Sequence, residues 1–272
     1  MMIKLFRKLP IKLQNFIKIK LYDLGYVKDD IFLIFKSLRG VVEKGTMLDV
    51  GGNVGNSALP FCLEGWEVTI FEPDPRNIIE LKKKFSQMDN VKIVEKAVSD
   101  KNNEKVEFFL SDITSINSLS SFDASHNKHI EVETITLDKY LQKEGVVEKI
   151  DFLKIDIEGY DLHALRGFNI EKFRPKMILV EYEDKKTVPL GYNYENLRSY
   201  IEKKGYKTIT FEYEPIVKYG KKHTLKRIFY GKNMTNPLGW GNILAIKNDE
   251  TEIDNKVYCT LEKRFKTYLK KE

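Results

Sequence analysis

The chain has 272 residues, 42% of them hydrophobic and 32% charged, which suits one large α/β domain with additions or two small domains. No apolar run approaches the roughly 18 residues that span a bilayer, and the lysine-rich N-terminus lacks the apolar core and cleavage site of a secretory signal, so we expect a cytoplasmic protein. The net charge of +6 is too small to indicate nucleic-acid binding, and no nucleic-acid partner is expected.

The first 20 residues carry six lysines and arginines and no acid. Apolar side chains between Leu5 and Ile17 fall on one face at helical spacing, although Pro10 should kink the helix. Two interpretations are open. The helix packs its apolar face on the main domain and leaves its lysines in water, or it docks the protein peripherally on an anionic membrane surface or a partner assembly.

After a helical extension (residues 1–40), strand and helix patterns alternate through residues 41–248, which predicts a mostly parallel sheet with helices on both faces. A charged terminal helix (residues 249–272) follows. Two extra strands, at 105–111 and 129–136, flank a loop rich in Ser, Asn and Asp. The main strands are expected at residues 46–50, 67–72, 91–97, 150–156, 176–183, 206–213 and 241–248, the last two as an antiparallel pair at the sheet edge.

A glycine-rich turn connects the first strand to the next helix in "MLDVGGNVGNSALPF". Asp49 ends the strand, and Gly51 and Gly55 allow the backbone to turn sharply and to approach a ligand. The dinucleotide fingerprint GxGxxG is absent, since the pattern here is DxGxNxG with Asn53 in the middle. The next strand ends in "IFEPDP", which places Glu72 where open α/β sheets bind ligands and where an acid can accept both ribose hydroxyls. The two acids suit an adenosine with a cationic amino-acid tail better than a pyrophosphate.

Carboxylates crowd the end of a second apolar strand in "IDFLKIDIEGYD". Asp156, Glu158 and Asp161 stand around one glycine, although each like charge raises the cost of ionising the others. Such crowding does not help a chain to fold. It therefore indicates a functional site.

Several of these blocks together resemble a known family. "LDVGGNVG", "FEPDP", "KAVSD", "VETITLDKYL", "DFLKIDIEGYDLHALRG" and "ILVEYE" occur in the order and spacing of the FkbM-type S-adenosylmethionine-dependent methyltransferases, over about residues 40–248. The resemblance implies the class I methyltransferase fold, a Rossmann-like sheet of seven strands with the last antiparallel. It also implies O-methylation of a hydroxyl, often on a sugar or natural product. Asp161 departs from the many relatives that carry Glu there.

The resemblance also implies roles for individual residues in binding S-adenosylmethionine. Asp49, Gly51, Asn53 and Gly55 would line its methionine part, and Glu72 would hold the ribose. The "KAVSD" turn, Ala97 to Asp100, would flank the adenine.

The carboxylates after the fourth main strand then acquire a chemical role. Methyl transfer to oxygen is an in-line displacement in which positioning dominates, and the acceptor hydroxyl must lose its proton to a carboxylate or an imidazole. A divalent ion, Mg²⁺ or Mn²⁺, held by Asp156, Glu158 and Glu181 could acidify the hydroxyl instead. His163, on the following helix, is weighed as the general base against a packing or surface histidine. Both routes stay open.

Two long connections, Ser111–Lys128 and Glu214–Trp240, are expected to select the acceptor. The basic run Lys218–Arg227 either lies in water or meets the phosphate of a nucleotide- or lipid-linked acceptor. We expect an O-methyltransferase that acts on a hydroxyl of a glycan, a sugar or a small metabolite. The alternatives are methylation of nitrogen, protein or RNA, and a catalytically silent methyltransferase-like binding module.

Overall fold

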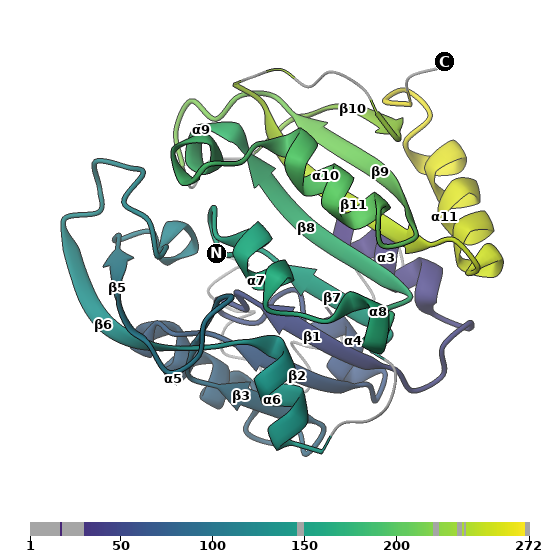
Figure 1. Cartoon of the computed structure of the whole chain (residues 1–272). Helices are drawn as coiled ribbons and strands as arrows, with labels where there is room; N and C mark the ends of the chain where they lie inside the picture. Colours follow the sequence, from purple (N-terminus) through teal and green to yellow (C-terminus); the bar gives the residue numbers. More distant parts are fainter. Residues whose placement is uncertain are drawn as a thin grey trace.

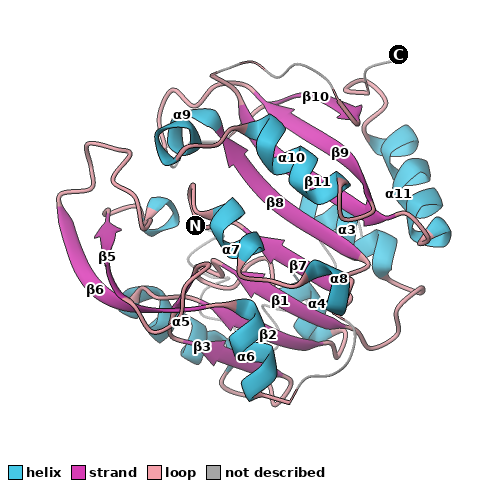
Figure 2. Cartoon of the chain, in the orientation of Figure 1, coloured by secondary structure: helices cyan, strands magenta, loops and turns pink. Residues whose placement is uncertain are grey.

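The computed structural model describes residues 17, 30–145, 150–219, 223–232, 236 and 238–269. A central sheet forms the middle layer of the fold (Figures 1 and 2). In spatial order its strands are β10 (Leu225–Tyr230), β9 (Tyr206–Tyr213), β11 (Trp240–Lys247), β8 (Met177–Glu183), β7 (Phe152–Ile155), β1 (Thr46–Val50), β2 (Glu67–Phe71) and β3 (Val91–Val94). Strands β3, β2, β1, β7 and β8 are parallel, whereas β11 runs antiparallel to both β8 and β9. The predicted fold class is confirmed.

The sheet has eight strands among the described residues, not the seven expected. The additional strand, β10, pairs antiparallel with β9 and forms the new edge. It comes from the basic segment, in which we expected no strand. Lys226 and Arg227 separate the apolar residues Leu225 and Ile228, and a register shift between Leu225 and Arg227 breaks the alternation that would indicate a strand.

The expected strand at 91–97 divides into β3 and the short β4 (Ala97–Val98). Strand β4 leaves the main sheet and pairs with β6 (Lys128–Ile135), which also pairs antiparallel with β5 (Lys105–Leu110). These three strands form a small second sheet, order β4-β6-β5, which projects from one side of the molecule in Figure 1. The two extra strands of the prediction are therefore present.

Helices cover both faces of the central sheet, and each face has its own hydrophobic core. One core contains side chains from α6 (Leu137–Lys143), α7 (Asp161–Arg166), α8 (Ile170–Phe173) and α10 (Tyr194–Glu202). The other contains side chains from α3 (Asp30–Leu38), α4 (Leu59–Leu63), α5 (Pro75–Phe85) and α11 (Thr251–Arg264). Neighbouring strand residues alternate between the two, as the pleat requires: Met47 lies in the second core and Leu48 in the first.

Helix α3 is the described part of the N-terminal extension. Its apolar residues are buried, and Phe35 makes an edge-to-face contact with Phe61 of α4 at 5.3 Å between ring centroids. The proposed docking helix of residues 1–20 lies outside the described residues except for residue 17, so its role stays a prediction. The division of the chain into three segments also stays a prediction.

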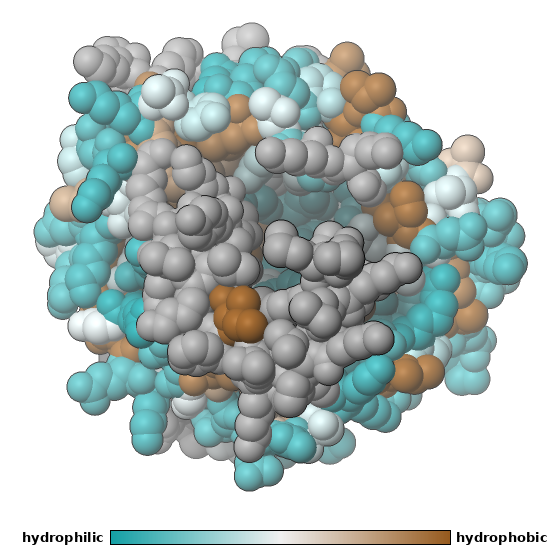
Figure 3. Space-filling view, turned by 180° about the vertical axis from the view of Figure 1, so that it is seen from behind, coloured by the Kyte–Doolittle hydropathy of each residue, from teal (hydrophilic) through white to brown (hydrophobic). Residues whose placement is uncertain are grey.

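No helix in the described part of the chain combines the length and hydrophobicity that crossing a bilayer requires. Figure 3 shows the face opposite to the view of Figure 1. The described side chains visible there are mostly hydrophilic, and the hydrophobic ones form small separate areas. Nothing in that view indicates a broad apolar surface among the described residues.

The packing of α3 predicts that this helix stabilises the whole domain. Phe35→Ala should lower the free energy of unfolding by about 3–5 kcal/mol, because it leaves a cavity against Phe61. Glu43→Ala, at an exposed position just after the helix, should change it by less than about 0.5 kcal/mol. Denaturant unfolding measures both. If Phe35→Ala lowered the free energy of unfolding as little as Glu43→Ala, α3 would contribute little to the stability of the domain.

Candidate active site

A cavity of about 350 Å³ opens at the carboxyl ends of β1, β2 and β7. Its size falls in the range of small-molecule sites, and its position is where open α/β sheets bind ligands. The lining comes from the loop after β1, the end of β2, the segment after β7, and the small sheet. Of the residues predicted for the cofactor or the chemistry, the cavity is lined by Gly51, Asn53, Glu72, Ala97, Asp156 and Glu158.

The glycine-rich loop lies close against neighbouring backbone. Gly51 has φ +78°, and a Cβ there would lie 1.9 Å from the carbonyl oxygen of Asp156. The N–H groups of Gly51 and Gly52 both donate to the carbonyl oxygen of Phe71, at 3.0 and 3.1 Å. Asn53 follows in the left-handed region at φ +48°, which asparagine tolerates better than most side chains. Only glycine fits at position 51, so the tight turn brings the loop backbone to the cavity.

Two residues predicted at the cofactor lie elsewhere. Gly55 faces α5, since a Cβ there would meet the ring of Phe85 at 2.5 Å. Asp49 is fully buried below the loop and is absent from the cavity lining. Its carboxylate accepts a hydrogen bond from Ser57 Oγ at 2.7 Å and lies 3.2 Å from Lys154 Nζ. Both residues therefore support the loop from behind.

Glu72 places a buried carboxylate at one end of the cavity. Its Oε2 accepts from the Asn53 N–H at 2.7 Å, and its Oε1 accepts from the Asp74 N–H at 2.9 Å. Burial raises the pKa of Glu72 to about 7, and the backbone hydrogen bonds oppose that rise. Each carboxylate oxygen keeps capacity for a further hydrogen bond. Glu72 thus both holds the glycine loop and offers an acceptor to a ligand.

The "KAVSD" turn is shared between two cavities. Ala97 and Val98 line the first cavity with Phe108 and provide an apolar wall. Ser99 and Asp100 line a second cavity, of about 490 Å³. Only the first half of the turn is therefore placed to flank an adenine.

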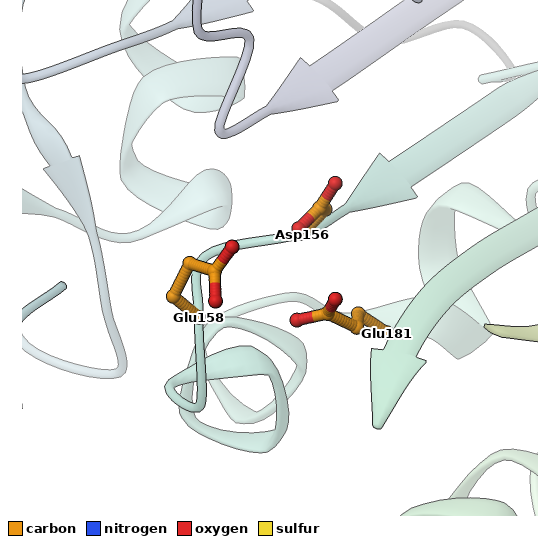
Figure 4. A group of neighbouring side chains, drawn as sticks. All are labelled: Asp156, Glu158 and Glu181. Atoms are coloured by element: carbon orange, nitrogen blue, oxygen red, sulfur yellow. The ribbon is translucent and has the colours of Figure 1, made fainter. Parts of the chain in front are cut away.

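Three carboxylates point toward one another beside the first cavity (Figure 4); Asp156 and Glu158 line that cavity and Glu181 does not. Asp156 follows β7, Glu158 lies in the next turn, and Glu181 comes from β8. One oxygen of each lies within 4.8 Å of the others. Burial raises the pKa of Glu158 and that of Glu181 above the usual glutamate range, whereas Asp156 is partly exposed, with 39% of its side chain accessible.

The turn that carries Glu158 is held by its neighbours. Glu158 has φ +59°, a conformation that costs a residue with a side chain about 1–3 kcal/mol. The Asp161 carboxylate accepts from the N–H groups of Ile157 and Gly159, at 3.3 and 3.1 Å. Tyr192 donates its hydroxyl to the carbonyl oxygen of Gly159 at 2.7 Å. Asp161 is thus a support of the turn, with its pKa raised to about 6 by burial.

Two buried lysines balance these acids, and we did not predict either from the sequence. Lys154 of β7 lies opposite Asp49 in the register of β1 and reaches Asp156 at 3.4 Å. Lys186, in α9 (Asp184–Thr187), contacts Glu158 and Glu181. The sequence signal for Lys154 was its position inside the apolar strand "FLKI". The only sequence signal for Lys186 is that it follows Glu183, the acid at the end of β8, by three residues.

His163 is not part of this group. It lines the second cavity, and its ring lies 4.7 Å from that of Tyr160, centroid to centroid. Burial lowers the pKa of His163. Another histidine, His126, also has a local contact, because its Nε2 lies 2.8 Å from the carbonyl oxygen of Ile116. The geometry therefore favours a carboxylate over His163 as the base.

A family model identifies the family of this chain. The model of the methyltransferase FkbM domain matches residues 49–208, which is more than half of the chain. The chain belongs to the FkbM methyltransferase family. It is accordingly an S-adenosylmethionine-dependent methyltransferase.

A curated relative of this FkbM methyltransferase is the 2-O-methyltransferase NoeI of Sinorhizobium fredii (strain NBRC 101917 / NGR234). The two are 27% identical over 170 residues, which cover 56% of this chain and 69% of NoeI.

Solved structures with a similar arrangement include two methyltransferases. Precorrin-6y C5,15-methyltransferase from Geobacter metallireducens GS-15 has a TM-score of 0.38 and 12% identity, and covers 80% of this chain and 88% of its own. Magnesium protoporphyrin IX methyltransferase from Synechocystis PCC 6803, solved with bound SAM, has a TM-score of 0.40 and 9% identity. The match covers 79% of this chain and 76% of that protein's chain.

The residues of the FkbM methyltransferase cavity fit S-adenosylmethionine. Glu72 offers a buried acceptor for ribose hydroxyls, the backbone of Gly51 lines the cavity, and Val98 adds to an apolar wall suited to a flat base. Asp156 provides negative charge for a cationic sulfonium or amino group. Glu72 follows β2 and Asp156 follows β7, so the two acids lie on either side of β1 and of the glycine loop that follows it.

The two segments expected to select the acceptor, Ser111–Lys128 and Glu214–Trp240, both have residues near these carboxylates. Thr114, Ser115 and Asn117 of the first segment line the cavity. Phe122 of the same segment and Tyr219 of the second lie 5.9 Å apart, centroid to centroid. The second segment is described only in part, since residues 220–222, 233–235 and 237 lie outside the described residues.

The hydrogen bonds of Glu72 predict its effect on cofactor binding. Glu72→Ala should weaken S-adenosylmethionine binding about 10- to 100-fold, corresponding to about 1.5–3 kcal/mol, because the ribose loses an acceptor and the Asn53 N–H loses its partner. Titration calorimetry measures the change. Glu67→Ala, at the exposed start of the same strand, is the matched control and should bind normally. Unchanged affinity in Glu72→Ala would remove Glu72 from the cofactor site.

Proposed function

We propose that this FkbM methyltransferase transfers a methyl group to a hydroxyl of a glycan, a sugar or a small metabolite. The observation that carries the proposal is the position of Glu158. Its carboxylate lines the same cavity as Glu72 and the glycine loop, is buried, and has a raised pKa. A base with such a pKa suits the removal of a proton from a hydroxyl near neutral pH.

The cofactor supplies an electrophilic methyl group on a sulfonium; transfer breaks the S–C bond, forms an O–C bond and leaves the hydroxyl proton to be taken up. Glu158 takes that proton. Asp156, beside it and partly exposed, binds the acceptor hydroxyl and directs its oxygen. The support of the turn by Asp161 keeps both carboxylates in place. Their rigid placement matters because the displacement requires collinear atoms.

The nature of the acceptor is supported by two observations. The relative NoeI is named a 2-O-methyltransferase. The cavity is lined by the hydroxyl side chains of Thr114 and Ser115, which can hydrogen-bond to a polyol. A nucleotide- or lipid-linked sugar stays within the proposal, because the basic run Lys218–Arg227 belongs to the second acceptor segment.

A panel of sugars tests the acceptor class. Aryl glycosides with free hydroxyls should receive methyl label from S-adenosylmethionine, and the matching 2-deoxy glycosides should receive less if the 2-hydroxyl is the target. Mass spectrometry locates the methyl group. The product should resist alkali, because an ether survives conditions that cleave a methyl ester. Label found only in alkali-labile product, or only on nitrogen of added amines or peptides, would contradict the proposal.

The roles of the two carboxylates predict a separation of binding from turnover. Glu158→Gln should lower turnover at least about 100-fold while S-adenosylmethionine affinity stays near normal, because the amide keeps the shape but cannot accept the proton. Asp156→Asn should lose less turnover and raise the Michaelis constant for the acceptor. Glu171→Gln, an exposed position in α8, is the control.

The pH profile gives a second measurement of the same role. The wild-type rate should fall as the pH falls, since Glu158 must be ionised to act. Because burial raises the pKa of Glu158, this decline should begin at higher pH than for an exposed glutamate. A rate that is flat down to pH values near 4.5, the usual glutamate range, would show that another group takes the proton.

A further inference from the structure

Lys186 places a positive charge inside the group of carboxylates. Its side chain is only 2% exposed, and its ammonium contacts Glu158, lies 3.3 Å from Glu181 Oε2 and lies 2.7 Å from Glu183 Oε2. Burial alone would lower the pKa of Lys186, but these three carboxylates outweigh it and raise the pKa well above its usual value. The side chain is therefore an ammonium ion.

Two aromatic rings complete the enclosure of this ammonium. Lys186 Nζ lies 4.9 Å from the ring centroid of Phe122 and 5.6 Å from that of Tyr219. The Tyr219 hydroxyl donates to Glu183 Oε1 at 3.0 Å. Ring faces attract cations, so the carboxylates and the rings act on the ammonium from different elements. This arrangement restricts Lys186 to one position.

This ammonium lies against two of the three carboxylates that could hold a metal ion. Asp156, Glu158 and Glu181 bring oxygens within 4.8 Å of one another, a spacing that could hold a divalent ion. Two of these three residues already have the Lys186 ammonium against them. Carboxylates this close need a nearby cation to stay ionised, and the chain supplies one that is covalently attached.

We propose that Lys186 takes the place of a divalent cation, so that its ammonium neutralises and orients Glu158 for a methyl transfer that uses no metal ion. Lys186 is a positioning residue, since it acts through Glu158 and does not line the cavity. The inference rests on the proposed function only in the role given to Glu158. The placement of the cation is independent of the acceptor.

Metal binding tests this placement without any acceptor. The variant Lys186→Met removes the charge and keeps most of the side-chain length, and Lys185→Met changes the exposed neighbouring lysine as the matched control. Titration of each protein with Mn²⁺, followed by calorimetry or electron paramagnetic resonance, should show a new site in Lys186→Met alone. That site should disappear in the double variant Lys186→Met/Glu181→Gln. A folded Lys186→Met protein that binds no Mn²⁺ would overturn the proposal.

The wild-type protein gives a second test, which holds even if Lys186→Met does not fold. We expect no Mn²⁺ site that depends on Glu181. Wild-type Mn²⁺ binding that is abolished by Glu181→Gln would mean that a metal displaces the lysine, and would overturn the proposal. Because neither measurement needs methyl transfer, a failure to find a sugar acceptor would count against the proposed function and not against this inference.

Activity on an acceptor from the glycoside panel shows whether the lysine orients the base. A chelator should leave the wild-type rate unchanged. Lys186→Met should lose about 100-fold in turnover with normal S-adenosylmethionine affinity, and added Mn²⁺ should restore part of the rate by replacing the lost charge. Lys186→Ala should be restored in the same way by a small primary amine such as ethylamine. A wild-type rate that falls with chelator, or a Lys186→Met rate equal to that of Lys185→Met, would overturn the proposal.

Discussion

The compensation of buried negative charge is the constraint on which the site depends. Carboxylates at the ends of parallel strands would be costly to bury alone, because desolvation favours their protonated form. Two lysines offset that cost, one from β7 and one from α9. Lys154 lies between Asp49 and Asp156, at 3.2 and 3.4 Å, and Lys186 contacts Glu158. The chain therefore supplies a cation beside Asp156 and another beside Glu158, and these cations favour the ionised form of the two acids.

The same constraint explains why the turn after β7 is so closely held. Glu158 has a left-handed backbone conformation, and without support the turn would relax and move the carboxylate away from Lys186. Ser118 donates to its carbonyl oxygen at 2.8 Å, and Asp161 accepts from the N–H groups on either side. These contacts come from separate segments, so the position of the base is determined by tertiary packing and not by the local sequence.

The sequence predicted those features that have a local cause. Alternating strand and helix patterns predicted the central sheet, and the glycine spacing predicted the turn at Gly51, where a side chain would meet backbone. The pattern could not show which face of the turn each residue occupies. Asp49 and Gly55 belong to the predicted motif yet point into the protein, because the register of β1 with β7 and the packing of α5 decide their direction.

The features that sequence reasoning missed depend on contacts between distant segments. Lys186 looks like an ordinary charged residue at the start of a short helix, and only the fold brings it against Glu158 from one side and against Phe122 and Tyr219 from the other. Those two rings belong to the segments expected to select the acceptor. Since both rings touch the cation that contacts the base, a movement of either segment changes the electrostatic surroundings of Glu158. The proposed function thus couples acceptor recognition to proton removal through one buried ammonium.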